Sequence, residues 1–269
     1  MKLPIRYTRV MSPLVVIVTG ASRGIGRKIA LDLGKQGHQL VLAARTLNPS
    51  GATGSLTETV RDVEAAGGSA IAIAADLSIP ADADRLVDSA VEKFGGLDAV
   101  VNNAAATGSG GRTLAEMSWE DWQRQFDTNL HGTFAVMRAA AGHLVDRGGG
   151  TIVNISSRAG DLSDDLEAGR LFSPAYAASK AAVNRLTNVV AGELRDKRVA
   201  VVALDPGSVR TERVAALKNL SPEHRARLVE MEVPSAAVVH LVTSGRALDW
   251  TGKLLRAKDF VERLELKED

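Results

Sequence analysis

The sequence predicts an α/β protein with a doubly wound, parallel, seven-stranded sheet between two layers of helices, a three-layer α/β/α arrangement. Short apolar runs alternate along the chain with longer stretches of helical periodicity, which is typical of parallel sheets. Runs such as LVLAA (40–44) and VAVVAL (199–204) lack polar alternation, as expected of strands buried on both faces. With 269 residues, 45% of them apolar, the chain is long enough to bury one large core.

The first predicted strand leads into the most specific local pattern. The apolar run Leu14 to Val18 is followed by TGASRGIG at 19–26 and then by RKIALDLGKQG, whose apolar residues share one helical face. We expect Gly20 to permit a tight turn, Gly24 to let the main chain approach a pyrophosphate, and Gly26 to let the helix pack on the strand. A bound phosphate would face the positive N-terminus of that helix.

The remaining strands follow in the same alternation with helices. Ligands of open parallel sheets bind beyond the carboxyl ends of the strands, so polar residues that follow strand ends predict one common cleft. The strands are expected at 14–19, 39–44, 69–74, 98–102, 150–155, 198–204 and 252–256. The residues expected at the cleft are the glycine turn, Arg45, Asp76, Asn103, Ser157 and Pro206.

Tyr176 and Lys180, in SPAYAASKAAVNRL, suggest a proton donor whose pKa can be tuned. Residues four apart share a helix face. A tyrosine pKa near ~10 must fall by roughly three units for acid–base work at neutral pH, and a cation about 4 Å away is adequate in magnitude. The other tyrosine, Tyr7, lies outside the predicted fold. The alternative is a half-buried ring beside a solvated amine.

Read together, these motifs resemble the short-chain dehydrogenase/reductase family, of the classical type. The resemblance covers roughly residues 13–256, and the motifs stand in family order. They are TGASRGIG (19–26), AADL (74–77), VNNA (101–104), Asn129 in DTNLHGTF, NISS (154–157), YAASK (176–180) and DPGSVRT (205–211). The resemblance implies a Rossmann fold and hydride transfer between a nicotinamide and a carbonyl or alcohol carbon.

The resemblance also implies roles for individual residues. Tyr176 would exchange the proton on the substrate oxygen, and Ser157 would hydrogen-bond that oxygen. Lys180 would hold the nicotinamide ribose and lower the pKa of Tyr176. Asn129 would orient a water that links Lys180 to solvent, unless its amide only bridges helix backbone. The implied cofactor-binding residues are Gly20, Ser22, Arg23, Gly24, Ile25, Gly26, Arg45, Asp76, Leu77, Asn103, Ala104, Tyr176, Lys180, Pro206, Gly207, Val209 and Thr211.

The end of the second strand bears on which dinucleotide is bound. An acid there would accept the adenosine ribose hydroxyl and repel a 2′-phosphate. The sequence instead has Ala44 followed by Arg45, and Arg23 lies in the glycine turn. Two arginines can hold a phosphate through charge-assisted hydrogen bonds. We therefore expect NADP(H), with NAD(H) possible; two solvated surface arginines are the alternative. Asp76 is expected to bind the adenine and Asn103 the adenosine ribose; Asp76 as a helix N-cap is the alternative.

Several segments depart from the family pattern. Ser157 and Tyr176 are farther apart than in relatives, and the added segment 161–173 is either a solvated loop or an acidic lip that favours polar or cationic substrates. Residues 46–54 either cover the adenine end or form an inert excursion. A short substrate lid is expected near 212–233. We expect one domain over 13–269, with an N-terminal extension at 1–12.

Composition excludes several other classes of function. The chain has no cysteine, so a disulfide, a thiolate metal site and a cysteine nucleophile are excluded. The net charge of +1 and scattered basic residues argue against nucleic-acid binding. No apolar run suits a membrane span, and no metal-ligand spacing is found among the histidines. We expect a cytoplasmic homo-oligomer, dimer or tetramer, that acts on a small carbonyl or alcohol substrate.

Two other functions are compatible with the fold. A non-catalytic NADP(H) sensor that regulates a partner would be expected to show a broken catalytic set, whereas Asn129, Ser157, Tyr176 and Lys180 are all present. An epimerase or dehydratase would use the cofactor transiently and usually has a larger C-terminal substrate domain. Net consumption of the cofactor distinguishes a reductase from both.

Overall fold

A computed structural model describes residues 12–48, 54–107, 113–162, 172–217 and 220–266. The predicted parallel sheet of seven strands is confirmed, and each observed strand lies within two residues of its expected position. The order across the sheet is β3-β2-β1-β4-β5-β6-β7, and all pairs are parallel. The strands are β1 Val15–Thr19, β2 Gln39–Ala44, β3 Ser69–Ala74, β4 Ala99–Asn102, β5 Gly150–Ile155, β6 Val199–Asp205 and β7 Leu254–Arg256.

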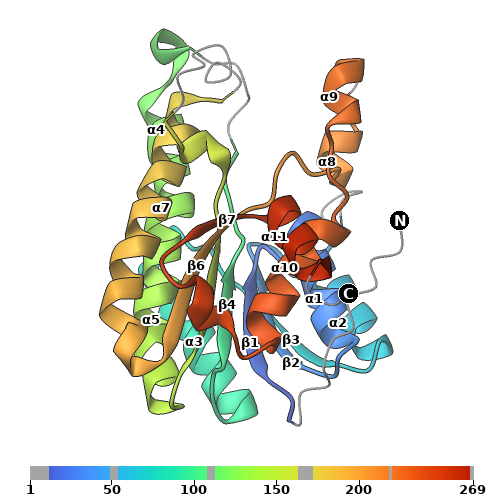
Figure 1. The fold of residues 1–269 in the computed structure, drawn as a ribbon, viewed down its shortest axis with the longest axis vertical. Helices are drawn as coiled ribbons and strands as arrows, with labels where there is room; N and C mark the ends of the chain where they lie inside the picture. Colours follow the sequence, from blue (N-terminus) through green and yellow to red (C-terminus); the bar gives the residue numbers. More distant parts are fainter. Residues whose placement is uncertain (1–11, 49–53, 108–112, 163–171, 218–219, 267–269) are drawn as a thin grey trace.

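Helices cover both faces of the sheet (Figure 1). One layer consists of α1 Gly24–Gly34, α2 Leu56–Ala65, α10 Glu232–Thr243 and α11 Ala257–Glu265, and the other of α3 Pro80–Phe94, α5 Gly132–Asp146 and α7 Pro174–Leu194. All residues of β1 and of β6 are buried, as the unbroken apolar runs predict. The strands between the layers therefore contribute to two separate apolar cores.

Smaller elements extend the fold beyond the carboxyl ends of the strands. Helix α4 runs directly into a π-helical segment and then into α5, and α8 and α9 project beyond the sheet on the side of α10 (Figure 1). These elements are α4 Trp119–Phe126, the π segment Asp127–His131, α8 Glu212–Ala215 and α9 Pro222–Ala226, with short 3-10 turns at Leu114–Glu116 and Arg158–Gly160. Two further 3-10 turns, Arg195–Lys197 and Ala247–Trp250, precede β6 and β7.

His38 directly precedes β2, at the amino ends of the strands, and it makes the stability of the fold depend on pH. Its side chain is 1% exposed and its Nδ1 accepts a hydrogen bond from the Leu14 amide at 3.2 Å, so the ring is held in its neutral form. Burial lowers the pKa of His38 below its ordinary value of 6.5, and the Asp98 carboxylate opposes this only in part. The unfolded chain therefore binds the proton more readily than the folded chain does.

We expect the free energy of unfolding to be constant above pH ~6.5 and to fall by at most about 1.4 kcal/mol per pH unit below it, down to the folded-state pKa. Urea unfolding between pH 7.5 and 5.5 measures this slope. His38→Gln keeps an acceptor for the Leu14 amide and should flatten it. An equal slope in both proteins would contradict the assignment.

Candidate active site

The glycine turn after β1 is held against the end of β4. Gly20 has a φ of +65°, and a Cβ on it would lie 2.9 Å from the Ala104 Cα. A Cβ on Gly26 would lie 2.4 Å from the Gly20 carbonyl oxygen. The Asn103 Nδ2 donates to the carbonyl oxygens of Thr19 and Gly20, at 2.9 and 3.2 Å. Only glycine at position 26 therefore allows α1 to approach the turn this closely.

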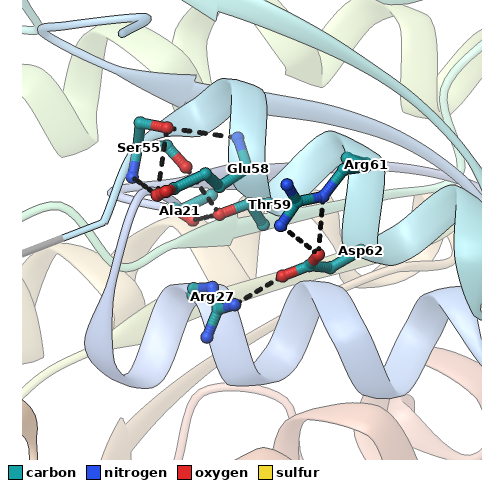
Figure 2. Close-up of polar contacts among 7 residues, drawn as sticks. All are labelled: Ala21, Arg27, Ser55, Glu58, Thr59, Arg61 and Asp62. Atoms are coloured by element: carbon teal, nitrogen blue, oxygen red, sulfur yellow. Dashed lines mark hydrogen bonds and ion pairs between the residues drawn. The ribbon is translucent and has the colours of Figure 1, made fainter. Parts of the chain in front are cut away.

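The beginning of α2 is fastened to the same turn (Figure 2). Ser55 and Glu58 form a capping box at its N-terminus, and the Thr59 hydroxyl donates to the Ala21 carbonyl oxygen at 3.1 Å. A Cβ on Gly54 would lie 2.7 Å from the Ser22 carbonyl oxygen. Lower along the two helices, Arg27 pairs with Asp62 at 2.5 Å, as Figure 2 shows. The turn is thus supported by both β4 and α2.

A cleft of about 730 Å³ lies along this turn and the neighbouring strand ends, a volume suited to a nucleotide-sized ligand. It is lined by ten of the predicted cofactor-binding residues, which are Gly20, Ser22, Arg23, Gly24, Arg45, Asp76, Leu77, Asn103, Ala104 and Thr211. The others do not line it, namely Ile25, Gly26, Tyr176, Lys180, Pro206, Gly207 and Val209. Gly26 packs against the Gly20 carbonyl of the turn. Val209 is buried and forms an isolated parallel β-bridge with Val229.

Sequence reasoning missed part of the lining. Most of the missed residues adjoin a recognised motif or lie in a motif, loop or lid that the sequence analysis had marked without naming them individually. Arg124 precedes Thr128 by one helical turn, so helix periodicity would have found it. The missed residues are Ala43, Thr46, Gly54, Ala75, Ala105, Ala106, Thr107, Arg124, Thr128, Glu212 and Arg213; Ala44 was singled out only for its lack of charge. Thr46 and Gly54 place both ends of the 46–54 loop at the cleft, and its middle lies outside the described residues.

The residues of this cleft fit a dinucleotide phosphate in most respects. The N-terminus of α1 has no side-chain cap and no acid in its first turn, so its amides are open to an anion. Arg23 and Arg45 both line the cleft and are exposed. Against this, the Glu212 Oε2 comes within 3.9 Å of the point where a Gly24 Cβ would lie. A phosphate at the turn would repel that carboxylate, which lies on the projecting helix α8.

Asp76 forms a turn of its own at the end of β3. Its Oδ1 accepts hydrogen bonds from the Ser78 amide at 3.0 Å and the Ser78 hydroxyl at 2.7 Å. The N-cap of α3 is Ile79, so the alternative interpretation of Asp76 as a helix cap is wrong. Its carboxylate lines the cleft beside Leu77.

Tyr176, Ser157 and Lys180 lie together at the carboxyl end of β5. The Ser157 side chain lies close enough to the Tyr176 phenol to lower the pKa of that phenol, and its hydroxyl accepts a hydrogen bond from the Ala159 amide at 3.1 Å. The Lys180 Nζ donates to the Ile155 carbonyl oxygen at 2.7 Å and lies 5.8 Å from the centre of the Tyr176 ring. The predicted proximity of phenol, hydroxyl and ammonium is therefore found.

The predicted lowering of the Tyr176 pKa by Lys180 is wrong, because the pKa of Tyr176 is raised. Burial raises the pKa of the phenol and the Asp205 carboxylate adds to this, whereas the nearby Ser157 side chain and the Arg213 charge lower it only in part. Burial also lowers the pKa of Lys180 to about 8. The ammonium is directed at the Ile155 carbonyl, so Lys180 does not reverse the effect of burial on Tyr176.

Asn129 lies in the π segment and is fully buried. Its Oδ1 accepts from the Ala106 amide at 2.7 Å, and its Nδ2 donates to the Ala106 carbonyl oxygen at 3.1 Å and to the Ser179 hydroxyl at 3.0 Å. Both of its donor hydrogens are thus bound by protein groups. The side chain joins the main chain of the loop after β4 to the Ser179 side chain of α7, and these contacts do not bridge helix main chain as the alternative interpretation had it.

The segment expected as a lid, 212–233, contains α8 and α9 and is described except for 218–219. Main-chain hydrogen bonds join Arg210 to Val229 and Val229 to Ser208, each at 2.8 Å. The Arg213 guanidinium donates to the Thr107 hydroxyl across the cleft. Residues 163–171 of the longer segment before Tyr176 lie outside the described residues, so neither interpretation of it is tested.

Within the described ranges, no helix is long and apolar enough to cross a bilayer, and no group of histidine, aspartate and glutamate side chains has the arrangement of a metal site.

Comparison with known proteins supports the interpretation of the motifs. The family model of the short chain dehydrogenases matches residues 14–221. The chain is 40% identical to 3beta-hydroxysteroid dehydrogenase 1 of Eggerthella lenta over 80% of this chain and 79% of that protein. It is 38% identical to a short-chain type dehydrogenase/reductase of Picea abies over 76% of this chain and 74% of that one. A solved short-chain type dehydrogenase/reductase from Mycobacterium marinum superposes with a TM-score of 0.79, at 30% identity, over 91% of this chain and 94% of that chain. The chain therefore belongs to the short-chain dehydrogenase/reductase family, of the classical type, whose members are oxidoreductases of CH–OH and C=O groups.

Proposed function

We propose that this protein is an NADP(H)-dependent oxidoreductase that interconverts a carbonyl compound and a secondary alcohol, with Tyr176 as the acid–base group. The observation that supports this most is the position of the buried Lys180 one helical turn farther along α7, with its Nζ 5.8 Å from the centre of the Tyr176 ring and Ser157 close to the phenol. The bound nicotinamide would supply the hydride, while the protein supplies position and field.

The protonation states favour reduction of a carbonyl. Burial raises the pKa of Tyr176, so the phenol is protonated at neutral pH, the form that gives a proton to the substrate oxygen. The Ser157 hydroxyl would donate to the same oxygen as negative charge develops there. The Lys180 ammonium uses one of its three donors on Ile155, which leaves two for the ribose hydroxyls of a dinucleotide.

The preference for NADP(H) is supported by charge at the adenosine end of the cleft. Arg23 and Arg45 line it next to the uncharged Ala44, and a 2′-phosphate there would meet two guanidinium groups and no acid of strand β2. We expect Arg45→Ala to lower kcat/KM for NADPH by about 10–100-fold and to leave that for NADH nearly unchanged, because a hydrogen bond to a charged group contributes about 1.5–3 kcal/mol.

The matched control is Arg195→Ala. Arg195 is an exposed arginine that precedes β6, at the amino ends of the strands and away from the cleft. Equal or better turnover with NADH by the unmodified protein would rule out the NADP(H) assignment.

Assembly and location remain proposals too. Each of α4, α5 and α7 exposes a large apolar side chain, Trp119, Phe134 and Val189 respectively, with exposed fractions of 66%, 51% and 52%. Exposed apolar side chains on these three helices support a homo-oligomer formed through them. We treat residues 13–269 as one domain, and the cytoplasmic location as a prediction.

The test is NADPH oxidation at about 340 nm across ketones, aldehydes, quinones and 3-oxoacyl thioesters, since reduced nicotinamide carries the hydride. Turnover with net NADPH consumption supports the reductase. Tight NADPH binding without turnover of any of these compounds would favour the non-catalytic sensor, and catalysis without net consumption would favour an epimerase or dehydratase.

A further inference from the structure

Two buried side-chain bridges hold the main chain of Tyr176 from both sides. On one side, the Ser173 hydroxyl accepts from the Tyr176 amide at 3.3 Å and donates to the Gln125 Oε1 at 3.1 Å. On the other, the Ser179 hydroxyl donates to the Tyr176 carbonyl oxygen at 2.9 Å and accepts from the Asn129 Nδ2 at 3.0 Å. The amide and the carbonyl of Tyr176 are thus each hydrogen-bonded to a serine hydroxyl, and each of these hydroxyls is hydrogen-bonded in turn to an amide side chain.

The two amides come from adjacent turns of the neighbouring helical segment. Gln125 is the last residue but one of α4 and Asn129 lies in the π segment, and α4 packs against α7 (Figure 1). Gln125 is 1% exposed and Ser173 is 3% exposed, so their bond is shielded from water. The Gln125 Nε2 donates to the Asp121 carbonyl oxygen at 3.2 Å, which fixes the side of the amide that faces Ser173. Loss of either partner would leave a buried polar atom unpaired.

The hydrogen bond between Gln125 and Ser173 lies at the end of the segment in which the chain departs from the family pattern. Ser173 is the last residue of the longer segment between Ser157 and Tyr176. Gln125 holds Ser173 from a different helix, so the place of Tyr176 does not depend on the length of the segment that precedes it. The Phe172 ring also stacks on the Tyr176 ring, with centroids 6.4 Å apart.

We propose that Gln125 is a positioning residue that acts through Ser173 to hold the Tyr176 phenol at the reacting atoms. The proposal rests on the proposed acid–base function of Tyr176 and assigns to Gln125 no contact with substrate or cofactor. Displacement of a catalytic group by about 1 Å is enough to lower a rate by up to about 10²-fold.

The kinetic test compares Gln125→Met, which keeps the volume but removes the amide, with Gln123→Met, the same change at an exposed position two residues earlier. We expect Gln125→Met to lower kcat about tenfold, with KM for NADPH within twofold of its original value. Ser173→Ala should act alike, and Ser173→Thr, which keeps the hydroxyl, should restore kcat. In a Tyr176→Phe background, Gln125→Met should have no further effect.

An unchanged kcat, or a loss of equal size in the Tyr176→Phe background, would overturn the proposal, because either result separates Gln125 from the phenol. A second measurement needs no substrate. The chain has two tyrosines, so a Tyr7→Phe protein labelled with 3-fluorotyrosine gives one fluorine signal, that of Tyr176.

We expect this signal to shift and broaden in Gln125→Met and to stay as it is in Gln123→Met. An identical signal in both variants would overturn the proposal even if the protein proved to be inactive on every carbonyl compound. A moved signal in an inactive protein would support the positioning of Tyr176 and reject only its catalytic function.

Discussion

Tyr176→Phe should lower kcat for carbonyl reduction by about 10²–10⁴-fold, the usual contribution of a positioned general acid, and leave NADPH binding nearly unchanged. The substitution removes only the hydroxyl, so the Phe172 contact and the main-chain bonds to Ser173 and Ser179 persist. Steady-state NADPH oxidation and a fluorescence titration with NADPH measure the two quantities separately.

The pH dependence supplies an internal check on Tyr176. The protonated phenol is the active form in reduction, and burial raises its pKa, so kcat should be flat through neutrality and fall only in alkaline solution. The lowered pKa of Lys180, about 8, predicts that NADPH affinity weakens above that pH if the ammonium holds the ribose. Full turnover by Tyr176→Phe with NADPH bound would refute the mechanism.

The fold was predictable because burial on both faces leaves a direct trace in the sequence. Strands such as β1 and β6 are buried at every position, so their apolar runs have no polar interruption and stand out from the helices between them. The glycine turn was predictable for a related reason. A contact as close as that between Gly26 and the Gly20 carbonyl excludes every side chain, so glycine has to recur at fixed spacing.

The interactions of the site were less predictable than its residues. The i, i+4 spacing correctly placed Tyr176 and Lys180 on one helix face, but the spacing says nothing about burial. Burial decides the direction of both pKa values, and it depends on elements distant in sequence. Gln125 escaped notice for the same reason. Its partner Ser173 is 48 positions away, and an amide without a motif gives no signal until the two helices are packed together.

Gly26→Ala should both destabilise the fold and abolish tight NADPH binding. The added Cβ would lie 2.4 Å from both the Gly20 carbonyl oxygen and the Asn103 Nδ2, and the first of these belongs to main chain that cannot rotate away. Overpacking of this kind costs about 1–3 kcal/mol. To relieve the contact α1 has to move off the turn, which separates its N-terminal amides from the place where a phosphate would bind.

Gly142→Ala gives the opposite expectation for the same chemical change inside a helix. Gly142 lies in α5, and a Cβ there would meet no atom within 4 Å. Alanine should therefore stabilise this helix by about 0.5–1 kcal/mol, since glycine has the greater freedom in the unfolded chain. Urea unfolding and NADPH titration of both variants, at a concentration where light scattering gives the same oligomeric state, measure the contrast. If Gly26→Ala were as stable as Gly142→Ala and bound NADPH as tightly as the unmodified protein, the close packing of α1 on the turn could not be what shapes the cofactor site.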